Sequence, residues 1–294
     1  MDEKSKSCSK CKKRPVPDLI YIQFFAEQFL LIEEITKLDR DLISQKIPRL
    51  NTIMPIAFGI ITAGKSMATL LVDGNITEAY IMARTFLERI TNLSYLLICQ
   101  EDIFKTFKNH SYQKIYRSIV TKWESFNLMD YELQKPKPSN FPPDMQEAID
   151  EFTSRRGKEI TRWTNEPLAK RFDAIHSKCP KFFKDKYILL TQFIYEDASE
   201  AAHGTLYGSL FHTGYIYGRA TNDEIIKYAV DNANNLCFFT GLLVEDLFHV
   251  LVSFDFDNKV LNDLLDKSKS SFNKLGDKIP KDDEELLKSL KRPT

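Results

Sequence analysis

The segment Tyr195-Glu-Asp-Ala-Ser199-Glu-Ala-Ala-His203 carries three side chains that could act together in chemistry. An α-helix turns about 100° per residue, so Tyr195, Ser199 and His203, spaced by four, would lie in a row on one face. Imidazole exchanges protons near neutral pH, and a hydroxyl group one turn away could orient it. The competing interpretation is a helix-packing histidine, hydrogen-bonded to Ser199 or to a backbone carbonyl.

The same segment favours neither a serine nucleophile nor a metal site. Ser199 would lie mid-helix, without the strand-turn-helix elbow that exposes a nucleophilic serine, so we expect it to orient rather than attack. His212, nine residues after His203, would need further ligands to hold zinc, and no His-Glu-x-x-His spacing is present. We therefore expect no metal and no cofactor.

Arg84 and Glu88 form a second candidate pair, one turn apart on a helix that otherwise looks buried. An ion pair within the helix is one interpretation, although arginine before glutamate is the less favourable order. In the other, Arg84 faces the interior of the bundle and holds an anion, while Glu88 fixes the guanidinium.

Two further patterns resemble nucleotide chemistry. Arg171 and His176 match a ribonuclease signature of small helical nucleases, but in a straight helix they would lie about 140° apart and converge only at a helix end. Residues 59–66 fit the phosphate-loop pattern G-x-x-x-x-G-K-S letter for letter. The stretch before them is helical and contains Pro55, so the strand that such a loop requires is missing.

Composition is that of an ordinary globular protein, with 294 residues of which 43% are hydrophobic and 28% charged. Lys+Arg and Asp+Glu both number 41, so no overall basic field indicates nucleic acid, although a local basic face is possible. Five scattered cysteines suit a reducing compartment, and the pair Cys8 and Cys11 lacks a second pair to complete a zinc site. Residues 1–14 lack the apolar core of a signal peptide, and the longest apolar run is only 53–61. We expect a cytoplasmic protein with no membrane span.

The spacing of apolar residues predicts a single all-α, multi-helix bundle, with a Pro-rich loop at 130–143 and no strands. Residues 204–218 hold four glycines among aromatic residues, which indicates either a loop with close backbone contacts or a thin helix pressed on a neighbour. We expect a mobile basic tail at 1–17, a bundle domain at 18–254 and a polar C-terminal extension at 255–294 with a mobile end. The predicted helices cover residues 19–38, 51–72, 76–99, 101–127, 144–155, 165–177, 184–202, 221–254 and a short stretch near 258–267.

The run Ala83-Arg84-Thr-Phe-Leu-Glu88, followed by Leu93-x-Tyr95-Leu-Leu, resembles the central helix of a widespread, uncharacterised family of bacterial helical proteins. That family also shows a tryptophan with a following Leu-Ala pair, here Trp163 and residues 168–169, and a helix that ends in Tyr-x3-Ser-x3-His. The resemblance covers roughly residues 50–250. Its members usually have small residues or proline after the histidine, where this chain has residues Gly204-Thr205.

The family is distantly similar to the HEPN superfamily of helical bundles, many of which are RNA-cleaving toxins or antiviral defence proteins. The resemblance implies metal-independent cleavage of RNA, in which Arg84, steadied by Glu88, holds the scissile phosphate and His203 transfers protons. Ser199 and Tyr195 would orient them. In this chain the arginine and histidine come from distant helices rather than from one Arg-x4–6-His motif.

The resemblance also implies RNA or a nucleotide as partner, and a homo-oligomer paired through the long helix at 221–254. The alternative function is a non-catalytic helical binding or oligomerisation module. In that alternative the same residues knit the bundle together, and we expect His203 to be buried and fully hydrogen-bonded.

Overall fold

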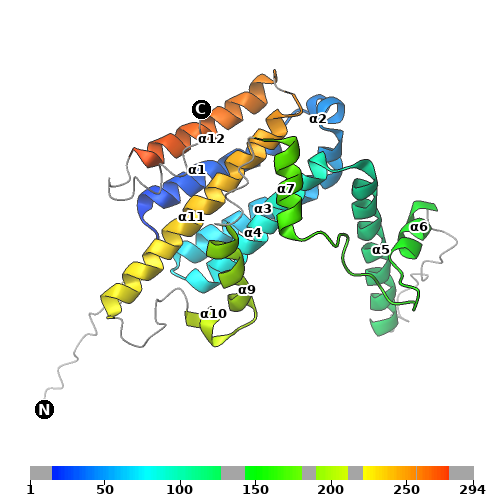
Figure 1. Cartoon of the computed structure of the whole chain (residues 1–294), viewed down its shortest axis with the longest axis horizontal. Coiled ribbons are helices and arrows are strands. Elements are labelled where there is room, and N and C mark those ends of the chain that lie inside the picture. The colour runs from blue at the N-terminus through cyan, green and yellow to red at the C-terminus, as the bar shows by residue number, and fades with distance from the viewer. Residues whose placement is uncertain (1–14, 127–142, 181–189, 211–220, 256, 278–294) are drawn as a thin grey trace, which may run out of the picture. The chain divides into compact units, whose positions relative to one another are not determined.

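The computed structural model describes residues 15–126, 143–180, 190–210, 221–255 and 257–277 (Figure 1). Within these ranges the regular structure is helical, and the strand-like pairing consists of one isolated bridge between Thr153 and Glu159. The predicted all-α class is therefore confirmed.

The chain divides into two compact units, one within residues 1–97 and 171–294 and one within 98–170. This differs from the single bundle expected over residues 18–254. The second unit has a small core of its own, because α5 (Glu101–Phe126) packs on α6 (Pro143–Glu151) and buries Phe104 and Phe152. Arg117 on α5 also donates to the Phe152 carbonyl oxygen, which holds the chain after α6 against α5.

The first unit contains the remaining helices, and its α7 contributes from Arg171 onward. One of them, η2, is a π-helix. Their bounds are α1 Leu19–Ile35, α2 Arg40–Lys46, α3 Pro48–Val72, α4 Ile76–Ile98, α7 Leu168–Lys178, η2 Thr191–Glu196, α9 Asp197–Ala202, α10 Leu206–Leu210, α11 Asn222–Val252 and α12 Lys259–Gly276.

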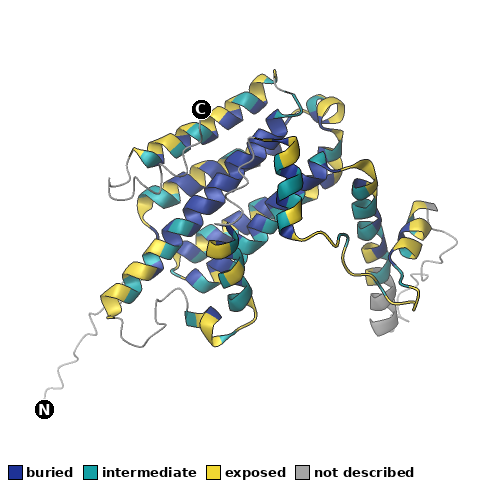
Figure 2. Cartoon of the chain, viewed as in Figure 1, coloured by how far each residue is buried: buried dark blue, intermediate teal, exposed yellow. Residues whose placement is uncertain are grey.

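Helix α11 is the central helix of the first unit. It begins where the sequence predicted, at a capping box in which Thr221 and Glu224 satisfy each other's backbone N–H groups. Its later turns are buried (dark blue in Figure 2) and pack against α1 and α12. Pairing of two chains through this helix, as expected from the HEPN resemblance, would thus compete with the chain's own core.

Helix α12 corrects the expectation of a polar extension from residue 255. The predicted short helix at 258–267 instead continues to Gly276, and buries leucines against α1 and α11. Gln28 on α1 donates to the Ser268 carbonyl oxygen at 2.8 Å, and the Ser268 hydroxyl donates back at 2.6 Å. A helix with this buried reciprocal contact belongs to the bundle.

Two helices, α3 and α11, are long and apolar enough by length and composition to cross a membrane. The expectation that no segment qualifies was wrong, because small and hydroxyl residues interrupt the apolar runs without making these helices polar on average. One or two such helices give weak support for a membrane protein, since a buried core helix such as α11 passes the same test.

Close packing of α1 on α11 depends on a glycine. A Cβ atom at Gly241 would collide with the ring of Phe24. We therefore expect Gly241→Ala to lower the free energy of unfolding by about 1–3 kcal/mol, as overpacked cores do. Urea unfolding followed by circular dichroism measures this change.

Gly276→Ala is the matched control, because a Cβ atom there meets no described atom within 4 Å. It should leave stability unchanged or raise it by up to about 1 kcal/mol through helix propensity. Equal stability of Gly241→Ala and the unmodified protein would contradict the close packing.

Candidate functional site

The guanidinium of Arg84 joins α4 to the η2–α9 segment. Its Nε donates to Glu88 Oε1 at 3.0 Å, its Nη1 to Ser199 Oγ at 2.8 Å and its Nη2 to Tyr195 Oη at 3.2 Å. Cζ also lies 4.3 Å from the centroid of the Tyr195 ring, which is a cation–π contact. Arg84, Glu88, Tyr195 and Ser199 are here called the Arg84 cluster. All four are among the five site residues predicted from the sequence.

Arg84 keeps binding capacity after making these contacts. Its guanidinium has five N–H groups, and three of them bond to the Arg84 cluster. One N–H on each terminal nitrogen has no acceptor among the described residues, and the side chain is 26% exposed. Two N–H groups in one plane fit the oxygens of a phosphate or carboxylate.

Glu88 fixes this guanidinium more than it stabilises the helix. An exposed pair at this spacing contributes at most about 0.5 kcal/mol, and the Glu88 side chain is 39% exposed. Its negative charge occupies the Nε side of Arg84. An incoming anion is therefore directed to the two terminal nitrogens.

The segment before His203 is not the straight α-helix expected for residues 184–202. Over the described part, the π-helix η2 leads into α9, so the rule of 100° per residue does not hold at Tyr195. Ser199 Oγ still donates to the Tyr195 carbonyl oxygen at 2.7 Å while it accepts from Arg84. That bond engages the hydroxyl proton, which agrees with an orienting role. π-Helices are rare in proteins, and those that do occur are frequently found at functional sites.

His203 is the predicted site residue that lies outside the Arg84 cluster. It is exposed at the C-terminal end of α9, and its side chain forms no hydrogen bond with another described residue. The interpretation of His203 as a buried packing histidine is therefore wrong. The hydrogen bond that this interpretation predicted between its ring and Ser199 is not formed. The backbone N–H of His203 donates to the Ser199 carbonyl oxygen at 3.1 Å, as in a regular helical turn. This spacing places the two Cβ atoms roughly 6 Å apart.

The turn after His203 explains part of the glycine-rich segment. Gly204 has φ +64°, a left-handed conformation that suits glycine at a helix end. The Thr205 hydroxyl accepts from the Gly208 N–H at 2.9 Å, and a Cβ atom at Gly208 would collide with the α9 backbone at Glu200. Helix α10 is thus the thin helix pressed on a neighbour. Residues 211–218, with His212, lie outside the described residues.

A second polar group borders the Arg84 cluster and was not predicted. Tyr80 lies one turn before Arg84 on α4, is buried, and donates to Asn232 Oδ1 at 3.1 Å. Tyr207 on α10 donates to Asp197 Oδ1 at 2.9 Å. The spacing of four between Tyr80 and Arg84 was visible in the sequence, whereas the other contacts join separate helices.

Burial sets the charge of this second group. It raises the pKa of Tyr80 well above its usual range and the pKa of Tyr207 to about 12, so both phenols donate at neutral pH. Burial also raises the pKa of Asp197, and the hydrogen bond from Tyr207 offsets part of that rise. Burial therefore disfavours the charged form of Asp197.

The two other nucleotide-like patterns do not form sites. Arg171 and His176 both lie on α7, with His176 in its last turn, and Arg171 Nη1 donates to Asn92 Oδ1 on α4. The sequence 59–66 lies within α3, where Lys65 pairs with Glu33 at 2.9 Å. Neither arrangement cradles a phosphate.

Among the residues that the structure describes, no group of three or more His, Cys, Asp or Glu side chains could hold a metal ion. Cys8 and Cys11 lie outside those residues. The three described cysteines, Cys99, Cys179 and Cys237, are buried and form no disulfide with one another.

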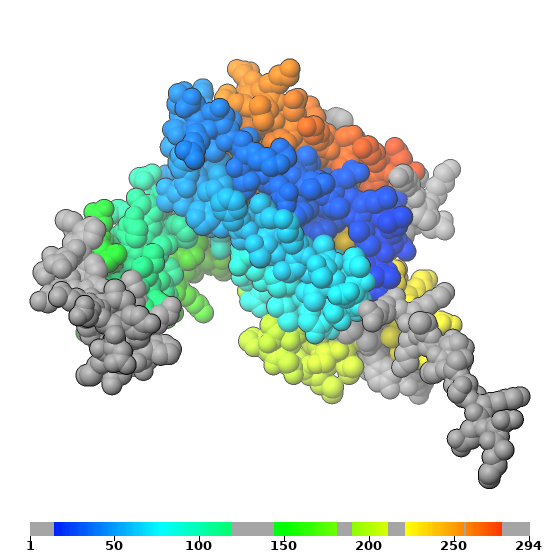
Figure 3. Space-filling model, turned by 180° about the vertical axis from the view of Figure 1, so that it is seen from behind, coloured from blue at the N-terminus to red at the C-terminus, as the bar shows by residue number. Residues whose placement is uncertain are grey.

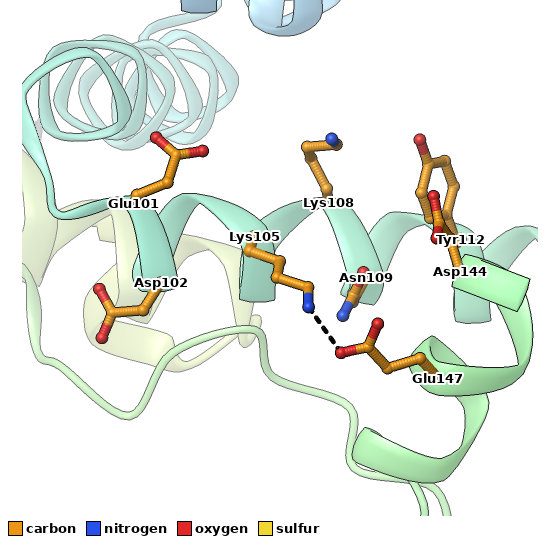
Figure 4. A pocket seen from close by; sticks show the side chains of 8 residues that line it. All are labelled: Glu101, Asp102, Lys105, Lys108, Asn109, Tyr112, Asp144 and Glu147. Carbon is orange, nitrogen blue, oxygen red and sulfur yellow. Dashed lines mark hydrogen bonds and ion pairs between the residues drawn. The ribbon is translucent and has the colours of Figure 1, made fainter.

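A cavity of about 290 Å³ opens between α5 and α6 in the second unit (Figure 4). Lys105 Nζ pairs across it with Glu147 Oε1 at 2.7 Å. None of the predicted site residues lies there, and the lining carries both signs of charge. The lining residues are Glu101, Asp102, Lys105, Lys108, Asn109, Tyr112, Asp144 and Glu147.

Comparison with known proteins identifies a family. The family described as "Family of unknown function (DUF5677)" matches residues 53–214, more than half of the chain. The chain belongs to this family. The predicted membership in an uncharacterised family is confirmed in this form, and the DUF5677 match includes His203 and every residue of the Arg84 cluster. No curated protein and no solved structure matches the chain.

The raised pKa of Asp197 predicts a pH-dependent stability. Because burial disfavours its charge, the folded state loses stability as pH rises through the folded pKa of this carboxyl group. Asp197→Asn removes that charge and keeps an acceptor for Tyr207. We expect the melting temperature of Asp197→Asn minus that of the unmodified protein to increase as the pH is raised from about 3 to about 7.

The matched control is Asp263→Asn, at an exposed carboxylate on α12. Its difference from the unmodified protein should stay flat over the same pH range in thermal unfolding. A flat difference for Asp197→Asn would contradict the burial of this charge.

Proposed function

We propose that the Arg84 cluster binds a phosphate group of RNA or of a nucleotide. We also propose that the protein is cytoplasmic and that it is a HEPN-like member of a bacterial toxin or antiviral defence system. The observation that carries the phosphate assignment is the fixed guanidinium of Arg84, which keeps two N–H groups available at the surface. The resemblance to HEPN proteins supports the biological context.

Preorganisation favours binding at Arg84. A free arginine side chain loses rotamer freedom when it binds an anion, but Tyr195, Ser199 and Glu88 already hold this one in place. The planar fork matches two phosphate oxygens, and the aromatic ring under it does not compete for the remaining N–H groups.

RNA cleavage would use His203 as the proton-transfer group. Neutral imidazole accepts the proton of the ribose 2′-hydroxyl as that oxygen attacks the adjacent phosphorus and the bond to the 5′-oxygen breaks. The leaving oxygen then takes a proton from the imidazolium, and the products are a 2′,3′-cyclic phosphate and a 5′-hydroxyl. Arg84 stabilises the negative charge that develops on the phosphoryl oxygens.

The exposure of His203 supports this role. The ring is free to rotate toward a ligand, and it is attached one turn from Ser199, the residue that contacts Arg84. One bound phosphodiester would therefore lie within reach of both side chains.

A second candidate function, oligomerisation, is favoured by α3. Only 33% of its most apolar stretch is buried, and Phe58 is 54% exposed. Figure 3, the view from behind, shows the surface formed by α3 and α4, which is coloured blue to cyan. We propose that a homo-oligomer, if formed, uses this face rather than α11, which the chain's own helices cover.

The enzyme proposal predicts that His203→Ala slows cleavage of single-stranded RNA by roughly 100-fold or more, the usual contribution of general acid–base catalysis. RNA affinity should stay unchanged, because the phosphate contact remains. Arg84→Gln should lose both affinity and cleavage. Denaturing gels measure cleavage, and fluorescence anisotropy measures affinity.

His176→Ala is the matched control, a half-buried histidine of the ribonuclease-like pattern in α7. This variant should cleave RNA normally. Loss of cleavage in His176→Ala would indicate that the catalytic site lies on α7. Unchanged RNA cleavage by His203→Ala, at unchanged stability, would refute the proposal that His203 catalyses this reaction.

The oligomer proposal predicts that Phe58→Asp dissociates the protein, because a carboxylate in an apolar interface loses its hydration. Size-exclusion chromatography with light scattering measures the mass. Leu30→Asp, at an equally exposed apolar residue of α1, should not change the mass. A monomeric unmodified protein, or an oligomer that survives Phe58→Asp, would refute the use of this face.

A further inference from the structure

A positively charged hairpin follows α6 in the second unit. Within residues 152–165 the charged side chains are four cations and one carboxylate: Arg155, Arg156, Lys158, Arg162 and Glu159. The four cations are exposed, and none of their side chains forms an ion pair or a hydrogen bond with another described residue. The chain as a whole has no net charge. Residues 152–163, here called the basic hairpin, therefore form the local basic face that the sequence left possible.

A closed turn places two arginines at the tip of the basic hairpin. The Gly157 N–H donates to the Ser154 carbonyl oxygen at 2.8 Å, with Arg155 and Arg156 between them. Gly157 has φ +73°, the left-handed conformation that ends a three-residue hairpin loop. Across the turn, the Ser154 N–H donates to the Lys158 carbonyl oxygen at 2.8 Å. The backbone that carries these three cations is thus fixed by its own hydrogen bonds.

The returning segment of the basic hairpin is held along α5 at every second residue. Its contacts are the ring of Trp163 on Phe107, the Thr161 carbonyl oxygen with His110 Nε2 at 3.0 Å, and the Glu159 carboxylate with Lys114. Two residues of extended chain cover about 6.6 Å and one helical turn about 5.4 Å, so the segment is extended and runs antiparallel to α5. Lys158 and Arg162 are therefore roughly 13 Å apart along a supported strand.

Glu159 does not cancel the charge of the basic hairpin. Its carboxylate is paired with Lys114, whose hydrogen bond lowers the pKa of Glu159. Arg117 on α5 donates to the Thr153 hydroxyl at 2.7 Å and adds a further cation at the base of the hairpin. The hairpin thus carries an excess of positive charge.

We propose that the basic hairpin binds the phosphate backbone of a nucleic-acid strand, as a contact surface independent of the Arg84 cluster. Cations in a row along an extended segment match a linear polyanion. Three of the four are arginines, and the planar guanidinium fits two phosphate oxygens. Backbone contacts carry no sequence information, so this surface binds strands of any sequence.

An anionic membrane fits the basic hairpin less well. Basic segments that bind membranes combine their charges with apolar side chains that enter the lipid. Among the large apolar side chains of the hairpin, Ile160 is 39% exposed, and Trp163 packs on Phe107. The hairpin offers charge rather than apolar residues for insertion.

Fluorescence anisotropy of a labelled single-stranded RNA, measured over a series of salt concentrations, tests the inference. The logarithm of the affinity falls with the logarithm of salt concentration, with a slope of about −0.7 for each neutralised phosphate of a single strand. The triple variant Arg155→Gln, Arg156→Gln, Lys158→Gln should therefore make the slope shallower by about 2. The double variant Arg155→Lys, Arg156→Lys keeps the charges and should keep the slope.

The matched control removes three positive charges from the first unit. Its substitutions are Lys259→Gln, Lys267→Gln and Lys274→Gln, at exposed lysines of α12. The salt slope of this variant should equal that of the unmodified protein. An equal change of slope in the two triple variants would show an effect of net charge alone and would overturn the basic hairpin as a binding surface.

RNA and DNA single strands of one sequence distinguish the two sources of the phosphate backbone. An equal change of slope for both strands supports a surface that reads charge alone, and a change confined to RNA supports RNA as the ligand. Displacement of the labelled strand by polyglutamate as effective as by unlabelled RNA would overturn the assignment to phosphate.

The outcomes also separate this surface from the Arg84 cluster. A shallower slope in the triple hairpin variant, with unchanged affinity in Arg84→Gln, supports the basic hairpin and refutes the Arg84 site. An unchanged slope in the triple hairpin variant overturns the hairpin inference, as does an unmodified protein that binds neither strand. Binding to phosphatidylserine vesicles that is lost in the triple hairpin variant, while the RNA slope is unchanged, would assign the hairpin to a membrane instead.

Discussion

A half-buried guanidinium constrains this structure more than any other group at its surface. Partial burial of a permanent charge is costly unless its N–H groups find acceptors. Arg84 draws one acceptor from its own helix and two from the η2–α9 segment, so one side chain joins that segment to α4. The π-turn at Tyr195 and the glycine turn after His203 then determine where α9 ends and α10 begins.

The bundle supplies the rigid support for this arrangement. α11 is buried among α1 and α12, with Gly241 admitting the Phe24 ring and Gln28 bonded to Ser268. Since α4 and α11 are both held in this core, the contact between Tyr80 and Asn232 sets the side of the site farthest from Glu88. Tyr207 is held separately, by its hydrogen bond to Asp197 on α9.

Polar side chains at regular spacing along α4 connect it to other parts of the molecule. Tyr80, Arg84, Glu88 and Asn92 follow one another at a spacing of four. Tyr80 donates to Asn232, Arg84 donates to Glu88, and Asn92 accepts from Arg171. Phenols and a carboxylate lie at one end, the guanidinium in the middle, and His203 one turn beyond its contact with α9.

The sequence by itself determined the helices and the local pairs. Periodic apolar residues predicted α4 and α11, and a spacing of four predicted the contact of Arg84 with Glu88. Such features depend on neighbours within a turn or two. The tertiary structure decided that residues 98–170 form their own unit, that His203 is exposed, and that Asp197 and Tyr207 border Arg84. Burial and contacts between helices depend on which faces pack together, and the periodicity of one helix does not specify its partner.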